Sequence, residues 1–271
     1  MAQPPQKLCY QPREIELKAA VFHGSGQPMT IESIEIEKPK RNEVLVRTSV
    51  SGLCHSDLHF IEGKYPTPVP AVLGHEAAGV VEAVGQDVTH VKPGDHVVTC
   101  LSVFCGHCEY CVTGNQTLCS NTAIKMPPGI AQRLRWKGAH LNQFLNLSSF
   151  AEQMLVHENA VVKIREEMPL DLAALLGCGV LTGYGAVVHS ARLKPGTTVA
   201  ILGCGGVGFS TIHAAHLAGA CRIIAIDIDP AKLEMARTFG ATDSMDAKDP
   251  EMVSKIVEMT GGGVHYSFEC I

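Results

Sequence analysis

A glycine-rich turn in the last third of the chain constrains the fold most strongly. It follows a short apolar segment, residues 198–202, and precedes a segment of helical composition, residues 207–217. Its residues are Gly203, Cys204, Gly205, Gly206, Val207 and Gly208. Between a strand and a helix, the pattern G-x-G-x-x-G lets backbone N–H groups at the helix N-terminus approach a pyrophosphate. Strand and helix patterns alternate from there to residue 269, so the sequence predicts a parallel, doubly wound sheet that binds a dinucleotide.

The choice of dinucleotide is indicated by Asp227, which lies at the end of the next predicted strand, residues 222–226. A carboxylate in this place accepts hydrogen bonds from the ribose hydroxyls of an adenosine and repels a 2′-phosphate. The sequence therefore predicts NAD rather than NADP. A helix N-cap is the alternative interpretation of Asp227, because a helix is predicted to begin near Pro230.

Four cysteines in the middle of the chain have the spacing of metal ligands. They are Cys105, Cys108, Cys111 and Cys119. Four thiolates close a tetrahedral shell around zinc and leave no open position, so this group predicts a structural zinc. An iron-sulfur cluster is an alternative, but the long final gap and the lack of a following proline favour zinc. Four thiols without a metal are a further alternative, although packing alone gives no reason for this spacing.

A second group of candidate ligands is dispersed along the chain. Cys54 and His75 flank a loop that contains several prolines, and Cys178 lies much further on, between two glycines. Thiolate and imidazole ligands suit zinc, whereas carboxylates alone would suit calcium or magnesium. Three protein ligands leave the fourth zinc position open, which is typical of a catalytic site.

The composition excludes several classes of protein. The chain has 271 residues, 46% of them hydrophobic and 18% charged, and a formal net charge of -5 without long runs of one sign, whereas nucleic-acid binding needs clustered Lys and Arg. Residues 1–16 lack the apolar region of a signal peptide, and the longest apolar stretch, residues 173–188, is too short for a membrane span. The 11 cysteines are odd in number and unevenly placed, which favours a reducing compartment over a disulfide framework. We therefore expect a cytoplasmic protein whose partners are small molecules.

Together these motifs resemble the zinc-dependent alcohol dehydrogenases of the medium-chain dehydrogenase family. The resemblance rests on the segment from Gly52 to Glu76, the four-cysteine group, the sequence around Cys178 and the glycine-rich turn, which occur in family order. It implies a GroES-like catalytic domain, residues 1–179, followed by the first part of a Rossmann-type NAD-binding domain, residues 180–271. It also implies two zinc ions per chain, one catalytic and one structural.

The resemblance further implies roles for residues around the predicted catalytic zinc. Ser56 and His59 would relay a proton to water, and Glu76 would tune the metal or enter its shell transiently. Contacts to the cofactor are implied for His55 at the pyrophosphate, Lys232 at the adenosine ribose and Thr182 at the nicotinamide. The expected reaction is reversible hydride transfer between an alcohol and NAD through a zinc-bound alkoxide, because zinc lowers the pKa of a bound alcohol.

The substrate is less constrained by the sequence. Glutathione-dependent formaldehyde dehydrogenases share this scaffold, and the segment from Gly261 to Glu269 resembles theirs. They carry an arginine shortly after the last cysteine of the lobe, whereas residues 120–124 contain none. We therefore predict a primary alcohol, aromatic alcohols included, with S-(hydroxymethyl)glutathione and polyols as alternatives.

The chain stops at Ile271, near the fourth strand of a sheet that has about six strands in a complete dinucleotide fold. From this we expect a chain that binds two zinc ions but turns over poorly. The resemblance implies a homo-oligomer for a full-length form, which we do not expect of this chain. A non-catalytic form that binds zinc and NAD is the alternative from another functional class.

Overall fold

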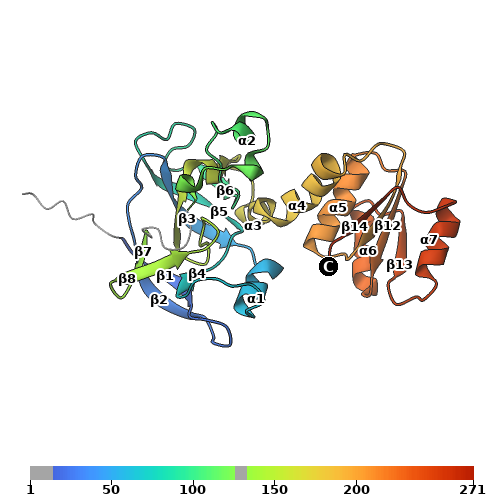
Figure 1. Ribbon diagram of the computed structural model, residues 1–271, viewed down its shortest axis with the longest axis horizontal. Coiled ribbons are helices and arrows are strands. Elements are labelled where there is room, and N and C mark those ends of the chain that lie inside the picture. The colour runs from blue at the N-terminus through green and yellow to red at the C-terminus, as the bar shows by residue number, and fades with distance from the viewer. Residues whose placement is uncertain (1–14, 126–132) are drawn as a thin grey trace, which may run out of the picture. The chain divides into compact units, whose positions relative to one another are not determined.

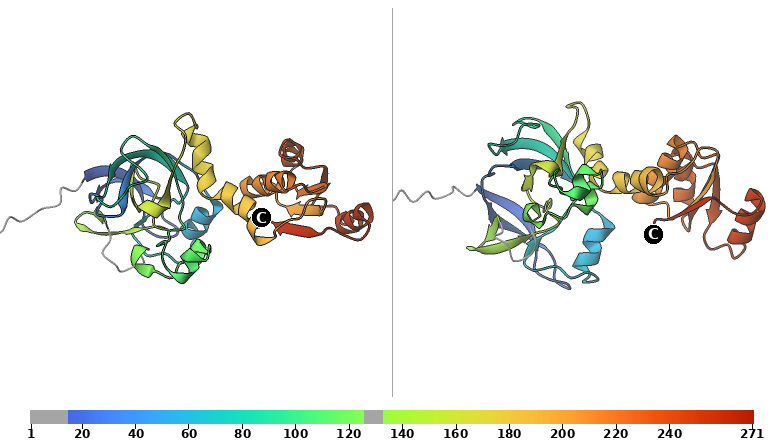
Figure 2. Two further views of the ribbon diagram at one scale, coloured as in Figure 1. Left: turned by 90° about the horizontal axis from the view of Figure 1, so that it is seen from above. Right: turned by 45° about the horizontal axis from the view of Figure 1, so that its top comes forward.

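The computed structural model describes residues 15–125 and 133–271, which form two compact units. The first unit ends at Gly177 and the second runs from Cys178 to Ile271, whereas the sequence placed the boundary after Gly179. Strands dominate the first unit, and strands alternate with helices in the second (Figure 1; Figure 2). Within the described residues no single helix is long and apolar enough to cross a membrane. One bent pair of helices, residues 170–177 with 179–190, meets the same criterion by length and composition alone.

The first unit contains a closed barrel with the strand order β1-β2-β7-β8-β4. The strands are β1 (Ile15–Phe22), β2 (Thr30–Ile36), β4 (Ala71–Val72), β7 (Leu134–Trp136) and β8 (Ala139–Gln143). Side chains alternate along the first part of β1, so that Leu17, Ala19 and Val21 join one buried cluster, whereas Glu16, Lys18 and Ala20 are more exposed. This alternation is the reason that the strand was readable from the sequence.

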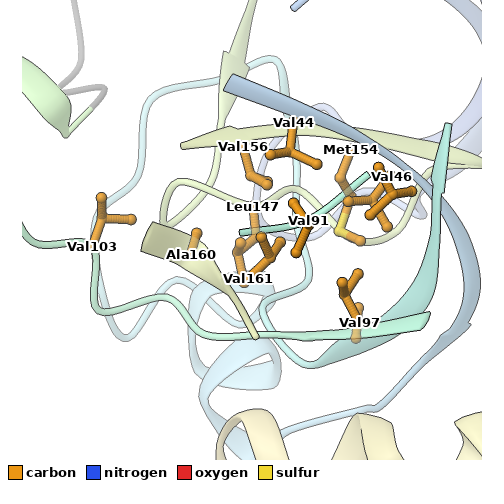
Figure 3. Close-up of a cluster of buried hydrophobic side chains, with 12 residues drawn as sticks. Val44, Val46, Val91, Val97, Val103, Leu147, Met154, Val156, Ala160 and Val161 are labelled. Carbon is orange, nitrogen blue, oxygen red and sulfur yellow. The ribbon is translucent and has the colours of Figure 1, made fainter. Parts of the chain in front are cut away.

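A five-stranded sheet with the order β10-β6-β5-β3-β9 completes the first unit. The strands are β3 (Glu43–Ser51), β5 (Ala77–Val84), β6 (His96–Thr99), β9 (Gln153–His157) and β10 (Val161–Lys163). Val44 and Val46 on β3, Val97 on β6 and Val156 on β9 share one buried cluster (Figure 3). Each such side chain contributes roughly 1.5–3 kcal/mol on burial, so this cluster supports the loops that carry the candidate ligands.

Residues 122–147 are rich in proline, glycine and polar residues, a composition that predicts a loop, and this prediction was wrong. Residues 126–132 lie outside the described residues, but β7 and β8 form an antiparallel hairpin within the rest. Lys137 and Gly138 both have positive φ, 51° and 77°, which matches a two-residue hairpin turn. The strands are short and rich in polar residues, so no apolar alternation identified them.

Helices of the first unit are short. They are α1 (His55–Ile61), α2 (Glu109–Val112) and α3 (Leu170–Ala174), with 3-10 turns η1 (Gln116–Leu118), η2 (Thr122–Ile124), η3 (Glu158–Ala160) and η4 (Leu175–Gly177). In Figure 1, α1 belongs to the segment between β3 and β4, and α2 lies in the excursion between β6 and β7. Each of these two helices lies beside part of one group of candidate metal ligands: Cys54 is the N-cap of α1, Cys108 is the N-cap of α2, and Cys111 is within α2.

The second unit is a parallel sheet with the order β13-β12-β11-β14, as the alternating patterns predicted. Its strands are β11 (Thr198–Leu202), β12 (Arg222–Asp227), β13 (Asp243–Asp246) and β14 (Tyr266–Glu269). Its helices are α4 (Gly179–Gly185), a π-helix η5 (Ala186–Ser190), α5 (Gly206–Leu217), α6 (Pro230–Thr238) and α7 (Met252–Thr260). Because β11 and β12 are central and parallel, the turns after them meet at one edge of the sheet.

Candidate functional site

The first candidate ligand, Cys54, is the N-cap of α1. Its sulfur accepts a hydrogen bond from the Ser56 N–H at 3.5 Å, and its own N–H donates to Asp57 Oδ2 at 3.3 Å. This reciprocal capping fixes the first turn of α1. The capping geometry therefore holds the thiol of Cys54 in one place before any metal binds.

His75 is held by the same carboxylate. The Nδ1 atom of His75 lies 3.0 Å from Asp57 Oδ1, and the Gly74 N–H donates to that oxygen at 3.2 Å. Both side chains are buried, with residue exposures of 1% for His75 and 3% for Asp57. A hydrogen bond from Nδ1–H to a carboxylate leaves Nε2 as the metal-binding nitrogen, the arrangement usual in histidine–zinc sites.

The protonation of His75 reflects this environment. Burial lowers the pKa of the imidazole, but hydrogen bonds with Asp57 and Cys54 oppose burial and raise the pKa to about 10. Those partners favour a positive charge at this position. A zinc ion would supply that charge and displace the proton, because a metal-bound imidazole is neutral.

The ligand atoms of Cys54, His75 and Cys178 all lie within 4.8 Å of one another. Cys178 directly follows Gly177, and a Cβ at Gly177 would collide with the carbonyl oxygen of Thr99. The glycine thus lets the backbone pass close to β6 just before the cysteine. Two thiolates and one imidazole at this separation fit a zinc ion and leave its fourth position open.

The remaining residues predicted for catalysis lie nearby in the first unit. Ser56 and His59 are on α1, where Ser56 is exposed and His59 is half-buried. Glu76 follows His75 and is buried, and a Cβ at Gly52 would collide with its carboxylate. A side chain at position 52 would displace the carboxylate of Glu76 from this place.

The four-cysteine group also comes together. The sulfur of Cys111 lies 3.4 Å from that of Cys108 and 3.9 Å from that of Cys105, and the sulfur of Cys108 lies 3.9 Å from that of Cys119. A tetrahedral zinc with Zn–S bonds of about 2.3 Å places its sulfurs about 3.8 Å apart. The four thiols therefore fit a closed zinc shell.

Backbone groups support negative charge on these sulfurs. The Cys105 N–H donates to the Cys119 sulfur at 3.3 Å, and the Cys108 N–H donates to the Cys105 sulfur at 3.4 Å. Hydrogen bonds from the backbone of Ser120 and then of Cys111 lower the pKa of Cys108 to about 5, whereas burial raises the pKa of Cys111 to about 11. Metal binding would remove the remaining protons, since the thiolate is the form that binds zinc.

In the second unit, the glycine-rich turn leaves space for a ligand. Gly203 has φ of +91°, and a Cβ at Gly208 would collide with the carbonyl oxygen of Gly203. By contrast, a Cβ at Gly205 or Gly206 would meet nothing within 4 Å, so the turn is open there. Gly205 is the N-cap of α5 and has no side chain to bond the first N–H groups of the helix. The cradle fits the pyrophosphate of a dinucleotide.

Asp227 ends β12 beside this turn. Its Oδ2 accepts from the Cys204 N–H at 2.7 Å and its Oδ1 from the Asp229 N–H at 3.0 Å. Burial raises the pKa of Asp227, but these hydrogen bonds and the charge of Lys232 lower it more, so the net pKa is lowered. The helix N-cap proposed as the alternative role belongs to Asp229, which accepts from the Ala231 N–H at 2.9 Å. Thr182 is exposed on α4.

Comparison with known families identifies the scaffold. The family described as "Alcohol dehydrogenase GroES-like domain" matches residues 40–166, and "Zinc-binding dehydrogenase" matches residues 206–271. An "Alcohol dehydrogenase class-3" from Pisum sativum is 42% identical over 269 residues, which are 96% of this chain and 71% of the relative. The chain belongs to the zinc-dependent alcohol dehydrogenase family. Its predicted family and fold class are thereby confirmed.

Two further relatives extend the comparison. An "S-(hydroxymethyl)glutathione dehydrogenase" from Saccharomyces cerevisiae is 41% identical over 95% of this chain and 70% of its own length. The crystal structure of a benzyl alcohol dehydrogenase from Acinetobacter calcoaceticus superposes with a TM-score of 0.87, at 38% identity, over 94% of this chain and 70% of the other. Membership of the zinc-dependent alcohol dehydrogenase family confirms that the chain is an oxidoreductase, as predicted, with zinc as a cofactor.

Asp57 is the functional residue that the sequence did not indicate. Its carboxylate accepts hydrogen bonds from the Cys54 N–H and the Gly74 N–H and contacts the imidazole of His75. A usable signal existed, because an acidic residue three positions after an N-cap is typical of a capping box. Its second role at His75 depends on a contact between distant segments, which the sequence does not reveal.

Proposed function

We propose that the chain catalyses reversible hydride transfer between a primary alcohol and NAD. The observation that carries this proposal is the convergence of Cys54, His75 and Cys178 with one zinc position left open. When bound there, zinc acts as a Lewis acid that makes the alcohol more acidic, and NAD accepts the hydride. The ionised Asp227 favours NAD over NADP, because it would repel a 2′-phosphate.

In this proposal, residues of α1 position the ligands and move the proton. Asp57 holds the imidazole of His75 so that Nε2 faces the metal. The hydroxyl of Ser56, two residues after the ligand Cys54, accepts the proton of the alcohol and releases its own proton towards the imidazole of His59. The imidazole of His59, which is half-buried on the same helix, then passes it to water. Glu76 acts as a buried carboxylate beside the metal.

Cofactor contacts complete the proposal. The free N–H groups of Gly205, Gly206 and Val207 bind the pyrophosphate at the N-terminus of α5. Asp227 and Lys232 bind the adenosine ribose, His55 assists at the pyrophosphate, and Thr182 contacts the nicotinamide. The oligomeric state and the cytoplasmic location stay predictions from the sequence.

The substrate proposal is an uncharged primary alcohol, with an aromatic alcohol preferred. A row of aromatic rings begins at the buried ligand His75. The ring centroids of Phe144 and His75 are 6.2 Å apart, those of Phe60 and Phe144 4.8 Å, and those of Tyr65 and Phe60 5.5 Å. Residues 120–124 contain no arginine to bind the carboxylate of a glutathione adduct. The following Lys125 donates instead to the Cys119 carbonyl at 2.9 Å. The benzyl alcohol dehydrogenase noted above acts on the class of alcohol that these rings favour.

An alcohol panel with metal analysis tests this function. NADH absorbance is followed with benzyl alcohol, an aliphatic primary alcohol, S-(hydroxymethyl)glutathione and a polyol, on protein with measured zinc content. We expect two zinc ions per chain, slow NAD-dependent turnover that is fastest with benzyl alcohol, and loss of one zinc in Cys178→Ser. Two zinc ions and NAD binding with no turnover of any alcohol would favour the non-catalytic alternative.

A further inference from the structure

Two histidines on α1 have neighbouring, tilted rings and belong to neither zinc group. His55 and His59 are four positions apart, so their side chains share one face of the helix. Their ring centroids are 4.6 Å apart with an interplanar angle of 41°. His55 is exposed and His59 is half-buried, so the pair is open to solvent on one side.

Packing holds the second imidazole in place. Tyr65 contacts the ring of His59 edge-on, with centroids 5.5 Å apart and an angle of 73°. Helical side chains lean toward the helix N-terminus, which directs the ring of His59 over His55. Within residues 15–125 and 133–271, neither imidazole has a hydrogen bond or an ion pair. Both rings therefore keep their nitrogens available to a ligand.

A carboxylate lies one turn further along the same face. Glu62 follows His55 by seven positions and His59 by three, the spacing of a single helical stripe. Its Oε2 accepts from Lys64 Nζ at 2.7 Å, and the side chain of Glu62 is 42% exposed. A hydrogen bond from Lys64 is the main cause that lowers the pKa of Glu62, and the charges of His59 and His55 contribute further. The negative charge of this carboxylate would favour a cation bound by the two histidines.

We propose that the imidazoles of His55 and His59 bind a divalent first-row transition ion at a third metal site. Two imidazoles at positions i and i+4 of a helix can chelate one metal, as in helical zinc motifs. Imidazole suits nickel, copper and zinc, whereas the two other groups contain the thiolates that select zinc. The site is assembled from one exposed helix and binds more weakly than either thiolate group.

Occupation of this site would inhibit the enzyme, a consequence that rests on the proposed function. In that proposal His55 assists at the pyrophosphate and His59 passes a proton to water. An ion held by both rings would withdraw both nitrogens, so it would weaken dinucleotide binding and block the relay. Excess transition metal would therefore be a reversible inhibitor at concentrations that leave both zinc groups filled.

Nickel binding to the zinc-loaded protein tests the site directly. Isothermal titration with Ni²⁺, followed by metal analysis, should show one nickel ion per chain while both zinc ions remain. His55→Gln and His59→Gln should each lower the nickel affinity by about 10- to 100-fold or more, since loss even of a supporting group costs this much. Because the two rings act as a unit, the double variant should lose little more than either single variant. Unchanged zinc content and circular dichroism show that the variants are folded.

Control variants and competition separate the outcomes. His140→Gln removes an exposed histidine on β8 and should leave nickel binding unchanged. Nickel binding that survives both α1 variants, or that is lost in His213→Gln on α5, would overturn the site. Nickel should also lower the affinity for NADH by about 10-fold, measured by fluorescence. His55-dependent nickel binding without that loss would support the metal site and overturn only the role of His55 at the cofactor.

Discussion

The two groups of candidate zinc ligands are built in opposite ways. The four-cysteine group comes from one short segment, Cys105 to Cys119, whose only regular elements are α2 and the turn η1. Cys54, His75 and Cys178 come from three distant places and are brought together by the fold. The first group therefore encodes its site locally, whereas the second depends on the surrounding architecture.

The side chains around the two groups also differ in burial. Around the four cysteines, large apolar side chains remain exposed, with Tyr110 at 43%, Leu118 at 60% and Val112 at 69%. Around His75, both the imidazole and the carboxylate of Asp57 are buried and hydrogen-bonded. A segment with so little core obtains its stability from the metal, as small zinc domains do. The dispersed group has its geometry fixed before a metal binds.

The largest expected effect is loss of the metal from the four-cysteine group. The sulfurs of Cys108 and Cys111 are the closest pair, and Cys111 is the more buried of the two. Cys111→Ser removes that thiol and should reduce the zinc content by one ion per chain. Binding free energies of structural zinc in small domains are about 10–16 kcal/mol, so the segment from Cys105 to Cys119 should unfold locally. Limited proteolysis with mass spectrometry should show new cleavage there and nowhere else in the first unit.

Cys221→Ser is the matched control, because Cys221 is an exposed thiol in the second unit. It should keep both zinc ions and the original cleavage pattern. If Cys111→Ser loses its zinc but stays resistant to protease, the lobe has its own stability and the comparison is wrong.

Loss of His75 should have a smaller effect on the fold and a large one on activity. His75→Gln removes one of three ligands and should abolish zinc binding at the dispersed group only. Turnover should fall by about 100- to 1,000-fold or more, the cost of removing one group that stabilises the transition state. The measurements are zinc content, NADH formation relative to the unchanged chain, and proteolysis. Cleavage between Cys105 and Cys119 in this variant would show that the two groups are not independent.

Asp57→Asn tests how far the fold prepares the dispersed group. The amide keeps the size of the side chain but loses the charge that orients the imidazole of His75. Supporting carboxylates of this kind are worth about 10- to 100-fold in metal affinity, so zinc at this group should bind that much more weakly. Competition with a chromogenic chelator measures the affinity of each zinc ion. Asp87→Asn, which removes an exposed ion pair with Arg41, should change the affinity of neither zinc ion.

The same contrast explains what the sequence could predict. The spacing of Cys105, Cys108 and Cys111 is visible in the chain, because those ligands are local. The strand and helix alternation after residue 197 was equally readable, since each βα unit has its own apolar period. Cys178 was predicted as a ligand because it stands between glycines, and the structure shows that Gly177 has to pass the Thr99 carbonyl.

Features that depend on distant contacts were missed. Asp57 has an ordinary place near the start of a helix, and its partnership with His75 arises only when the chain folds. The hairpin of β7 and β8 was interpreted as loop because its strands are short and polar, and their pairing with β2 and β4 closes the barrel. The periodicity of apolar residues indicates which face of a helix or strand is buried. It therefore gives little information on short polar strands whose burial depends on remote segments.

The smallest effect is expected at Ser148, which ties a left-handed loop to the strand before His75. The Ser148 hydroxyl accepts from the Phe144 N–H at 2.8 Å and donates to the Val72 carbonyl at 2.8 Å. Ser148→Ala leaves these buried groups without that partner and should lower the free energy of unfolding by about 1–3 kcal/mol. Urea denaturation measures the change.

Ser148→Gly is the matched variant, because Ser148 has φ of 59°, a conformation that glycine adopts without strain. It loses the same hydroxyl but relieves roughly 1–2 kcal/mol of backbone strain, so it should be less destabilised than Ser148→Ala. Both variants should keep zinc at the four cysteines, since the loop supports residues 72–74 through the Ser149 N–H bond to Gly74 and the Phe150 N–H bond to Leu73. Release of the four-cysteine zinc by either substitution would mean that the local group also relies on the fold around His75.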